Sequence, residues 1–214
     1  MDVVETIDDL PGADVSSVVT LGNFDGVHLG HRELFRQTVQ RARQLNARSI
    51  VYTFEPHPLK FLMPDRAPLL LNTSAEKERL IAASHVDLLI RESFTSELAS
   101  MSAGDFVQKT LVNRLKVKHL VVGYDYAFGR GREGDGGFLK KQGETYGFGV
   151  DVLQPIGADG HPYSSTRIRK LISAGEVRDV VDLLGLHYTF DGRVVPGEQR
   201  GRKLGFPTAN LVTE

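Results

Sequence analysis

Short runs rich in β-branched residues alternate with helical patterns along most of this 214-residue chain. The runs occupy residues 17–21, 49–53, 87–90, 119–123 and 150–153. Such runs are typical of buried parallel strands. Between the first two, an amphipathic helix is predicted, because apolar or small residues recur there at helical spacing. These residues are Leu34, Thr38, Ala42 and Leu45. The alternation predicts an α/β fold with a doubly wound parallel sheet, in which ligands bind beyond the carboxyl ends of the strands.

Two further patterns predict where helices begin. Thr73 stands three residues before Glu76, and Ser102 three residues before Asp105. A hydroxyl followed at this spacing by an acid can satisfy the free amides of a first helical turn. A helix is therefore expected after each of them.

The composition narrows the class of protein and of ligand. The chain has no cysteine, which excludes disulfides, thiolate zinc sites and cysteine nucleophiles. No apolar stretch approaches the roughly twenty residues that span a bilayer. The acidic first segment lacks the basic start of a secretory signal, so a cytoplasmic location is expected. The net charge of −1 lacks the excess of basic residues that would indicate binding to a nucleic-acid backbone. We expect small-molecule partners, with no nucleic acid and no membrane; the oligomeric state stays open.

The character of the sequence changes near Gly185. A helical pattern of valines and leucines over residues 177–184 ends at this glycine, which is typical just after the C-terminus of a helix. Beyond it, glycines and prolines surround a pair of valines, a pattern typical of antiparallel strands or loops. The sequence thus predicts one domain over residues 1–184 and the start of a second module over residues 185–214.

The segment GNFDGVHLGH, residues 22–31, lies between the first predicted strand and the amphipathic helix. Its glycines let the backbone approach a ligand, and the helix start offers free amides and a positive dipole end to phosphate. His28 and His31 lie three residues apart, so both imidazoles can face one phosphate chain and donate hydrogen bonds as charge develops. Half a metal site, or two ordinary polar residues at a helix cap, are the alternatives for this pair.

A second segment, YSSTRIRKL at residues 163–171, predicts a helix that begins with arginines. The candidates for its N-cap hydroxyl are Ser164, Ser165 and Thr166. Arg167 and Arg169 then fall in the first turn, where cations are unfavourable. Their presence indicates an anion between them and the amides, and guanidinium groups suit phosphate oxygens. The alternative is a capped helix with solvent-facing arginines.

Four motifs together resemble a known family. GxFDGxHxGH and SSTxIR resemble the nucleotidyltransferase superfamily. FEPHP at residues 54–58 and LGFPTAN at residues 204–210 narrow the resemblance to the bifunctional riboflavin kinase/FMN adenylyltransferases, the prokaryotic FAD synthetases. The motifs come in the family's order and cover nearly the whole chain. The resemblance implies a Rossmann-like nucleotidyltransferase fold followed by the start of a β-barrel kinase module. It also implies transfer of AMP from ATP to FMN, giving FAD and pyrophosphate.

The resemblance assigns roles to individual residues. The catalytic residues would be His28, His31 and Arg167. The nucleotide would lie along Gly22, Asn23, Phe24, Asp25, Gly26, Asp125, Ser165, Thr166 and Arg169. The flavin would contact Phe54, Pro56, His57, Pro58, Phe61, Tyr126 and Phe128.

Two of these assignments have alternatives. FEPHP could be an ordinary loop with core aromatics, and the glycine-rich segment 123–137 could be a flexible loop without ligand contacts. That segment resembles the family's GxDFxFGxxRxG, with Tyr126 in place of a phenylalanine. Tyr124 and Ala127 depart from the family's acidic and basic residues.

The resemblance also implies magnesium bridging the ATP phosphates with few protein ligands. The FMN phosphate needs no dedicated base, because a phosphate monoester has a second pKa of about 6 and is mostly ionised near neutral pH. In the second module, Thr208 and Asn210 would lie near magnesium and ATP. Family members also phosphorylate riboflavin, but the chain stops soon after these residues, so we expect no kinase activity.

Two other functions compete with FAD synthesis. The nearest is another nucleotidyltransferase, acting on pantetheine phosphate, nicotinamide mononucleotide or a polyol phosphate. The second is a flavin- or nucleotide-binding regulator that keeps the fold and lacks turnover. FEPHP and PTAN count against the first, and the intact histidines and Arg167 count against the second.

Overall fold

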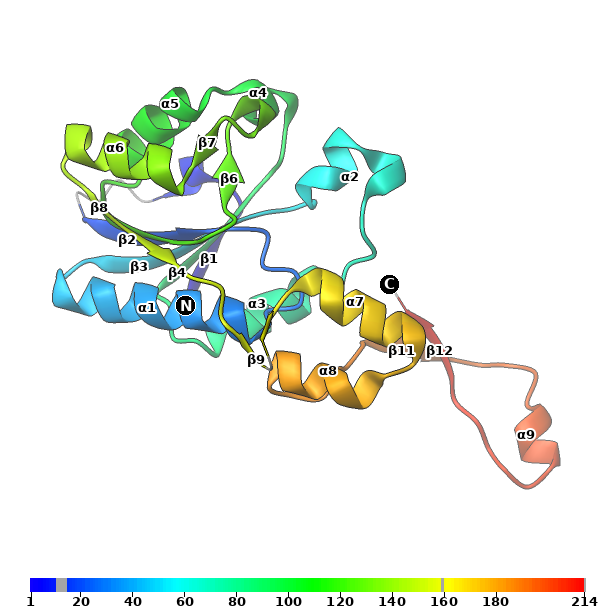
Figure 1. Ribbon diagram of the computed structural model, residues 1–214. Coiled ribbons are helices and arrows are strands. Elements are labelled where there is room, and N and C mark those ends of the chain that lie inside the picture. Colours follow the sequence, from blue (N-terminus) through cyan, green and yellow to red (C-terminus); the bar gives the residue numbers. More distant parts are fainter. Residues whose placement is uncertain (11–14, 159, 214) are drawn as a thin grey trace.

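A six-stranded parallel sheet forms the centre of the computed structural model, which describes residues 1–10, 15–158 and 160–213 (Figure 1). The strands lie in the order β1-β4-β3-β2-β5-β8, and every neighbouring pair is parallel. Their bounds are β1 Asp2–Val4, β2 Ser17–Leu21, β3 Arg48–Phe54, β4 Leu88–Glu92, β5 Val117–Gly123 and β8 Gly149–Leu153. The predicted fold class and the five predicted strands are confirmed. β1, which lies at the edge beside β4, was not predicted.

The order of the strands reverses between β2 and β5. From β2 the chain proceeds through β3 and β4 toward one edge, and it then returns to place β5 and β8 on the other side of β2. The loops after β2 and β5 therefore diverge at a topological switch point. Open α/β sheets bind their ligands in the crevice at this point.

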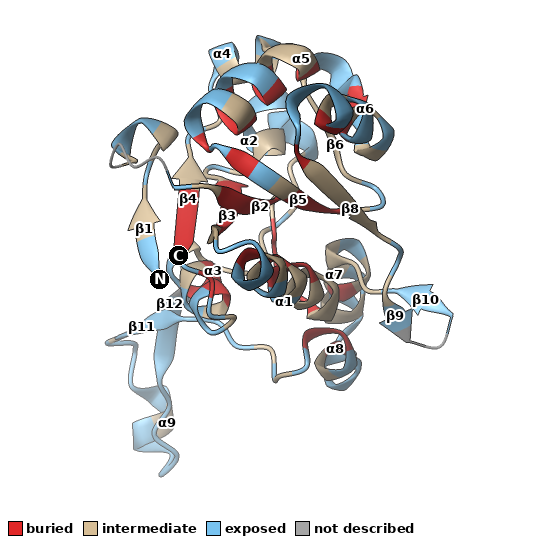
Figure 2. Cartoon of the chain, turned by 90° about the vertical axis from the view of Figure 1, so that its left-hand side faces the viewer, coloured by how far each residue is buried: buried red, intermediate tan, exposed pale blue. Residues whose placement is uncertain are grey.

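Helices cover both faces of the sheet in two layers (Figure 1). α1 Leu29–Gln44 and α3 Ser74–Ala82 pack on one face. The other face is covered by α4 Ser96–Ser100, α5 Ala103–Asp105, η3 Phe106–Arg114 and α6 Gly136–Tyr146. Successive residues of β2 point to opposite faces, so Val18 packs in the cluster with α1 while Val19 packs in the cluster with η3. Figure 2 shows the central strands buried between the two layers.

The amphipathic pattern predicted for α1 is confirmed over most of its length. Leu34, Thr38 and Ala42 are buried, and Phe35 joins them. Leu45 is 44% exposed, so the buried face of the helix ends before this last residue of the predicted pattern. The reason is local, since Leu45 is the C-cap and its backbone has already left the helical conformation.

The predicted helix caps are present. The side chain of Thr73 accepts a hydrogen bond from the amide of Glu76, and Ser102 accepts one from Asp105. Gly185 adopts the left-handed conformation at the C-terminus of α8 Val177–Leu184, as expected. The remaining short elements are η1 Ile7–Asp9, α2 Pro58–Leu62, η2 Pro64–Arg66, β6 Ala127–Phe128, η4 Arg130–Arg132, β7 Gly134–Asp135, β9 Gly157–Ala158 and β10 His161–Pro162.

Two helices form a third cluster beside the sheet. α7 Ser165–Ala174 and α8 Val177–Leu184 bury Ile168 and Val180 against Leu71, a residue of the segment before α3. This packing holds the N-terminus of α7 near the α1 and α3 side of the sheet (Figure 1). The second predicted motif is thereby carried toward the loop after β2.

The last described residues form an antiparallel hairpin. β11 Gly192–Val195 pairs with β12 Asn210–Thr213, and α9 Arg200–Lys203 lies in the connection. The predicted antiparallel character is confirmed, and Figure 1 shows the hairpin extending away from the sheet. Among the helices that the structure describes, none is both long and apolar enough to cross a membrane.

Candidate active site

Asp25 joins the loop after β2 to two distant segments of the chain. One oxygen of its carboxylate accepts a hydrogen bond from the amide of Leu71 at 2.9 Å, and the other forms an ion pair with the Arg169 guanidinium. Its backbone carbonyl accepts a hydrogen bond from the Ser165 hydroxyl at 2.7 Å. The two predicted phosphate motifs, 140 residues apart at Asp25 and Ser165, are therefore in direct contact.

His28 and His31 lie together at the start of α1. His28 is the N-cap residue, and its Nδ1 accepts a hydrogen bond from the amide of His31 at 3.3 Å. The two rings are stacked, with centroids 3.5 Å apart. Because Nδ1 of His28 is an acceptor, its proton in the neutral form is on Nε2, which leaves that atom as a hydrogen-bond donor.

Both histidines are neutral near physiological pH. Burial lowers the pKa of His28 from 6.5 to about 4. Burial also lowers the pKa of His31 well below 6.5, and the neighbouring His28 lowers it further. Nδ1 of His31 is buried and has no hydrogen-bond partner among the described residues. A pair of neutral imidazoles, of which His28 is buried and His31 half-buried, has free hydrogen-bonding capacity and suits an anionic ligand better than a plain helix cap does.

The glycines of this loop are required by its own packing. A Cβ atom on Gly26, which has φ of +83°, would lie 2.7 Å from the Leu71 side chain. A Cβ atom on Gly22 would lie 2.9 Å from the ring of Phe24, which is itself buried. This packing explains why glycine stands at both positions, and the close approach of the loop backbone to a ligand stays a prediction.

The N-terminus of α7 has the predicted cap and a free arginine. Ser164 is the N-cap, and its hydroxyl accepts a hydrogen bond from the amide of Arg167. Among the described residues, the Arg167 side chain has no hydrogen bond or ion pair, and Thr166 is exposed. Arg169 instead binds Asp25 and donates a second hydrogen bond to the carbonyl of Leu69. The two arginines thus differ, since one has protein partners and the other is available to a ligand.

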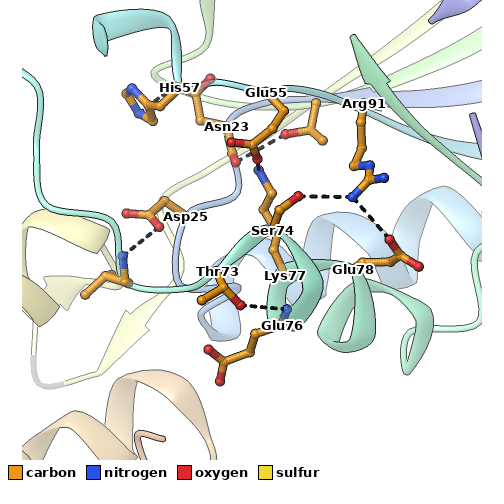
Figure 3. Close-up of polar contacts among 12 residues, drawn as sticks. Asn23, Asp25, Glu55, His57, Thr73, Ser74, Glu76, Lys77, Glu78 and Arg91 are labelled. Carbon is orange, nitrogen blue, oxygen red and sulfur yellow. Dashed lines mark hydrogen bonds and ion pairs between the residues drawn. The ribbon is translucent and has the colours of Figure 1, made fainter. Parts of the chain in front are cut away.

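FEPHP lies beside the first motif. Asn23 Nδ2 approaches His57 Nε2 at 3.3 Å, and the Thr53 hydroxyl donates to the carbonyl of Asn23 (Figure 3). His57 is also the N-cap of α2, where its Nδ1 accepts a hydrogen bond from Leu59. Pro58 is the first residue of that helix, a position that suits proline. The peptide bond between Glu55 and Pro56 is cis, and it is the only cis bond among the described residues.

Aromatic side chains gather around the predicted flavin contacts. Phe54 and Phe61 both make edge-on contacts with Phe94, at centroid distances of 5.5 and 6.0 Å. Phe61 is 46% exposed, so part of this cluster faces solvent. Phe94 was not predicted, because its surrounding sequence carries no motif.

The loop after β5 contributes a second aromatic pair. Tyr126 and Phe128 are stacked at 5.5 Å, and like Phe54 they pack against the core on the η3 side of the sheet. Asp125 is exposed. In the part of the chain that the structure describes, its side chain makes no hydrogen bond or ion pair with residues of the loop after β2. The position predicted for the nucleotide contact of Asp125 therefore stays a prediction.

A shallow, open surface cavity of about 510 Å³ lies beside the start of α1. It is lined by Leu29, Glu33 and Gln37 of α1, by residues 153–156 after β8, and by Tyr163. Tyr163 also borders the histidine motif, since a Cβ on Gly30 would lie 3.6 Å from it. This cavity was not predictable from local patterns, because its walls come from the outer side of one helix and from the segment after a strand at the sheet edge.

No protein-built metal cage is present in the described ranges, where no three His, Cys, Asp or Glu side chains lie close enough to hold an ion. Thr208 and Asn210 line a smaller hollow of about 240 Å³ in the C-terminal hairpin, together with Gly197 and its neighbours. This hollow lies within the hairpin that extends from the body. The metal role predicted for these two residues stays a prediction.

Comparisons with known proteins agree with the geometry. The chain matches the FAD synthetase family over residues 11–167 and the riboflavin kinase family over residues 184–214. It is 37% identical over 212 residues to the bifunctional riboflavin kinase/FMN adenylyltransferase of Buchnera aphidicola subsp. Acyrthosiphon pisum, covering 99% of this chain and 68% of the relative. The protein of the same description from Escherichia coli K12 is 41% identical over 194 residues, covering 91% of this chain and 62% of the relative.

A solved structure has the same fold. It is described as a macrolide-efflux protein from Streptococcus pneumoniae, and it matches with a TM-score of 0.85 and 35% identity. The match covers 99% of this chain and 68% of that chain. This chain therefore spans roughly two thirds of the length of the proteins to which it is similar.

Proposed function

This chain belongs to the FAD synthetase family, and we infer that it transfers the AMP part of ATP to FMN, giving FAD and pyrophosphate. The observation that carries this inference is the contact of Asp25 with Ser165 and Arg169. It brings two histidines, two helix N-termini and the free Arg167 to one edge of the sheet. Helix N-termini and guanidinium groups suit a polyphosphate chain.

The adenosine part of ATP is proposed to occupy the cavity of about 510 Å³ beside α1. Its volume lies within the range of small-molecule pockets, which span roughly 300–1,000 Å³. The cavity borders His28 through Leu29 and Gly30, so the phosphates would continue directly to the histidine pair.

Catalysis is proposed to rest on positioning and charge stabilisation. The FMN phosphate attacks the α-phosphorus of ATP, the bond to the β-phosphate oxygen breaks, and pyrophosphate leaves. His28 and His31 enter as neutral donors, and Arg167 adds a fixed positive charge. Preorganised donors of this kind stabilise the charge that develops on the departing oxygen. No covalent enzyme intermediate is required.

Magnesium would accompany the nucleotide. With no cluster of three acidic or histidine side chains in the described residues, the ion would be held mainly by the phosphates of ATP. When bound, it would neutralise charge on those phosphates.

The flavin is proposed to bind on the other side of residues 22–28, the loop between β2 and α1, which we call the histidine loop. FEPHP contacts that loop through Asn23, and the exposed edge of Phe61 offers an apolar surface for a ring system. Phe54, Tyr126 and Phe128 pack on the same face of the sheet. The FMN phosphate would then point toward the ATP site.

We place the domain boundary between residues 184 and 185. The adenylyltransferase domain would comprise residues 1–184, and residues 185–214 would be the first part of a riboflavin kinase domain. Riboflavin phosphorylation is not expected from this polypeptide, because a single hairpin leaves its strand edges unpaired and encloses no barrel.

A test of acceptor choice separates this function from its rivals. The polypeptide is incubated with ATP, magnesium and one acceptor at a time: FMN, riboflavin, pantetheine phosphate or nicotinamide mononucleotide. We expect an adenylylated product from FMN alone. A product from another phosphate would support a different nucleotidyltransferase, and a product from riboflavin would show that the kinase fragment is active.

A further inference from the structure

Lys77 is a buried cation in the first turn of α3. Only 8% of the residue is exposed, and its Nζ lies 3.1 Å from Oε2 of Glu55, the second residue of FEPHP (Figure 3). The two residues come from separate elements, since Glu55 directly follows β3. Lys77 belongs to none of the predicted phosphate or flavin motifs.

The position of Lys77 is unfavourable for a lysine in two ways. It is the fourth residue of a helix that Thr73 caps, and the N-terminal turn of a helix repels cations. Burial of an ammonium group adds a desolvation cost. A lysine at such a place is stabilised by its anionic partner, and the only ion-pair partner it has among the described residues is Glu55.

Glu55 in turn holds the start of FEPHP in place. Its amide donates to the carbonyl of Glu92 at 3.0 Å, and its carboxylate is held from the other side by Lys77. Two residues later, His57 reaches Asn23 in the histidine loop. The ion pair therefore fixes the segment that joins the flavin side of the site to the phosphate side.

The charges around His57 show how close this ion pair lies to the site. Burial is the largest cause that lowers the pKa of His57, and the positive charges of Arg169 and Lys77 lower it further. Asp25 and Glu55 oppose that effect. Lys77 thus lowers the pKa of His57 and Glu55 raises it, so both charges lie near this imidazole.

We propose that Lys77 is a positioning residue for FMN binding, acting through its ion pair with Glu55 to hold FEPHP against the histidine loop. This rests on the proposed flavin side of the site. Lys77 does not touch FMN or ATP in this arrangement. Its loss weakens FMN binding because the loop is no longer held, whereas the ATP side, which depends on Asp25 and α7, is preserved.

The test is a double-mutant cycle on the full chain with FMN and ATP. The variants are Lys77→Met, Glu55→Gln and both together, with Lys77→Arg as the conservative replacement. Arg79→Met serves as control, because Arg79 is an exposed cation on the same helix and its ion pair, with Glu76 at 3.8 Å, does not involve FEPHP. KM for each substrate, kcat and melting temperature are measured for every variant.

We expect both single variants to raise the KM for FMN about tenfold and to leave the KM for ATP within about twofold. The double variant should be no worse than the more affected single one, because both remove the same interaction. Lys77→Arg should recover most of the wild-type KM, and the control should match wild type.

Three results would overturn the proposal. One is a rise in the KM for FMN of the double variant that equals the rises of the two single variants multiplied together. Another is an equal rise of both KM values. The third is a fall of kcat in Lys77→Met with a silent Glu55→Gln, which would mean that Lys77 binds a substrate phosphate itself. His57→Ala separates this inference from its premise. If that variant leaves the KM for FMN unchanged, the flavin side is misplaced; if it raises the KM while Lys77→Met does not, only the inference fails.

Discussion

Asp25 and Arg169, 144 residues apart in the chain, form an ion pair that closes the loop after β2 against the N-terminal half of α7. The Asp25 side chain is 8% exposed and the Arg169 side chain 21%. Because the carboxylate also binds the amide of Leu71, this one group positions three segments of the site. The Asp25 carboxylate thereby compensates for the unfavourable positive charge of Arg169 near a helix N-terminus.

Asp25→Asn should therefore weaken both folding and turnover. Removing one partner of a buried ion pair leaves the other charge uncompensated, and partial exposure of Arg169 reduces the cost to about 1–3 kcal/mol. Turnover should fall at least about tenfold, since misplacement of catalytic groups is costly. Thermal unfolding and steady-state kinetics check both effects. Wild-type values for both would mean that the ion pair does not organise the site.

His28→Asn separates the structural role of His28 from its chemical one. Asparagine is a favourable N-cap, and its side-chain oxygen can replace Nδ1 as the acceptor for the His31 amide. The variant loses the Nε2 donor, so kcat should fall about 100-fold. Its melting temperature at pH 7 should stay close to that of the wild type. Near-normal turnover would remove His28 from the catalytic residues.

The low pKa of His28 predicts a pH dependence of stability. In the unfolded chain the group has a pKa near 6.5, and in the fold its pKa is about 4. Between these values the unfolded state binds more protons, so stability falls as the pH drops from 6.5 toward 4 and is unaffected by this group above 7. Protonation of His28 in the unfolded chain should therefore lower the free energy of unfolding by about 1–2 kcal/mol between pH 7 and pH 5.

Urea unfolding at the two pH values measures this loss. His28→Asn should show a smaller loss than the wild type, because its remaining pH dependence lacks this group. His31, whose pKa burial also lowers, contributes to the remainder in both proteins. Equal losses in the two proteins would contradict the assigned protonation state.

Filling the cavity beside α1 should affect ATP alone. Ile156 lines the cavity and is partly exposed, so Ile156→Trp can place its ring there without disrupting the core. We expect the KM for ATP to rise about tenfold and the KM for FMN to stay within about twofold. Equal effects on the two substrates, or none, would place the adenosine elsewhere.

Local patterns made much of the fold predictable. Buried parallel strands are apolar on both faces, which is why five of the six were evident as short β-branched runs. The caps at Thr73, Ser102 and Gly185 followed from residue types at fixed spacings. β1 escaped prediction because its three residues are too few to form a pattern.

The long-range parts of the site could not be predicted in the same way. The motifs indicated which residues would handle phosphate, but the contact of Asp25 with Arg169 depends on how α7 returns to the sheet. The pairing of Lys77 with Glu55 and the cavity at Tyr163 likewise arise from topology. Residues of this kind carry no local signal, because each is ordinary in its own stretch of sequence.

Transfer of AMP to FMN is tested by following ATP labelled at the α-phosphate in the presence of FMN and magnesium. We expect that the label enters FAD, that pyrophosphate appears in equal amount, and that His28→Asn slows both about 100-fold. Flavin that binds to the protein without transfer of the label or release of pyrophosphate would contradict it, and would mark the chain as a binding protein with the fold of an enzyme.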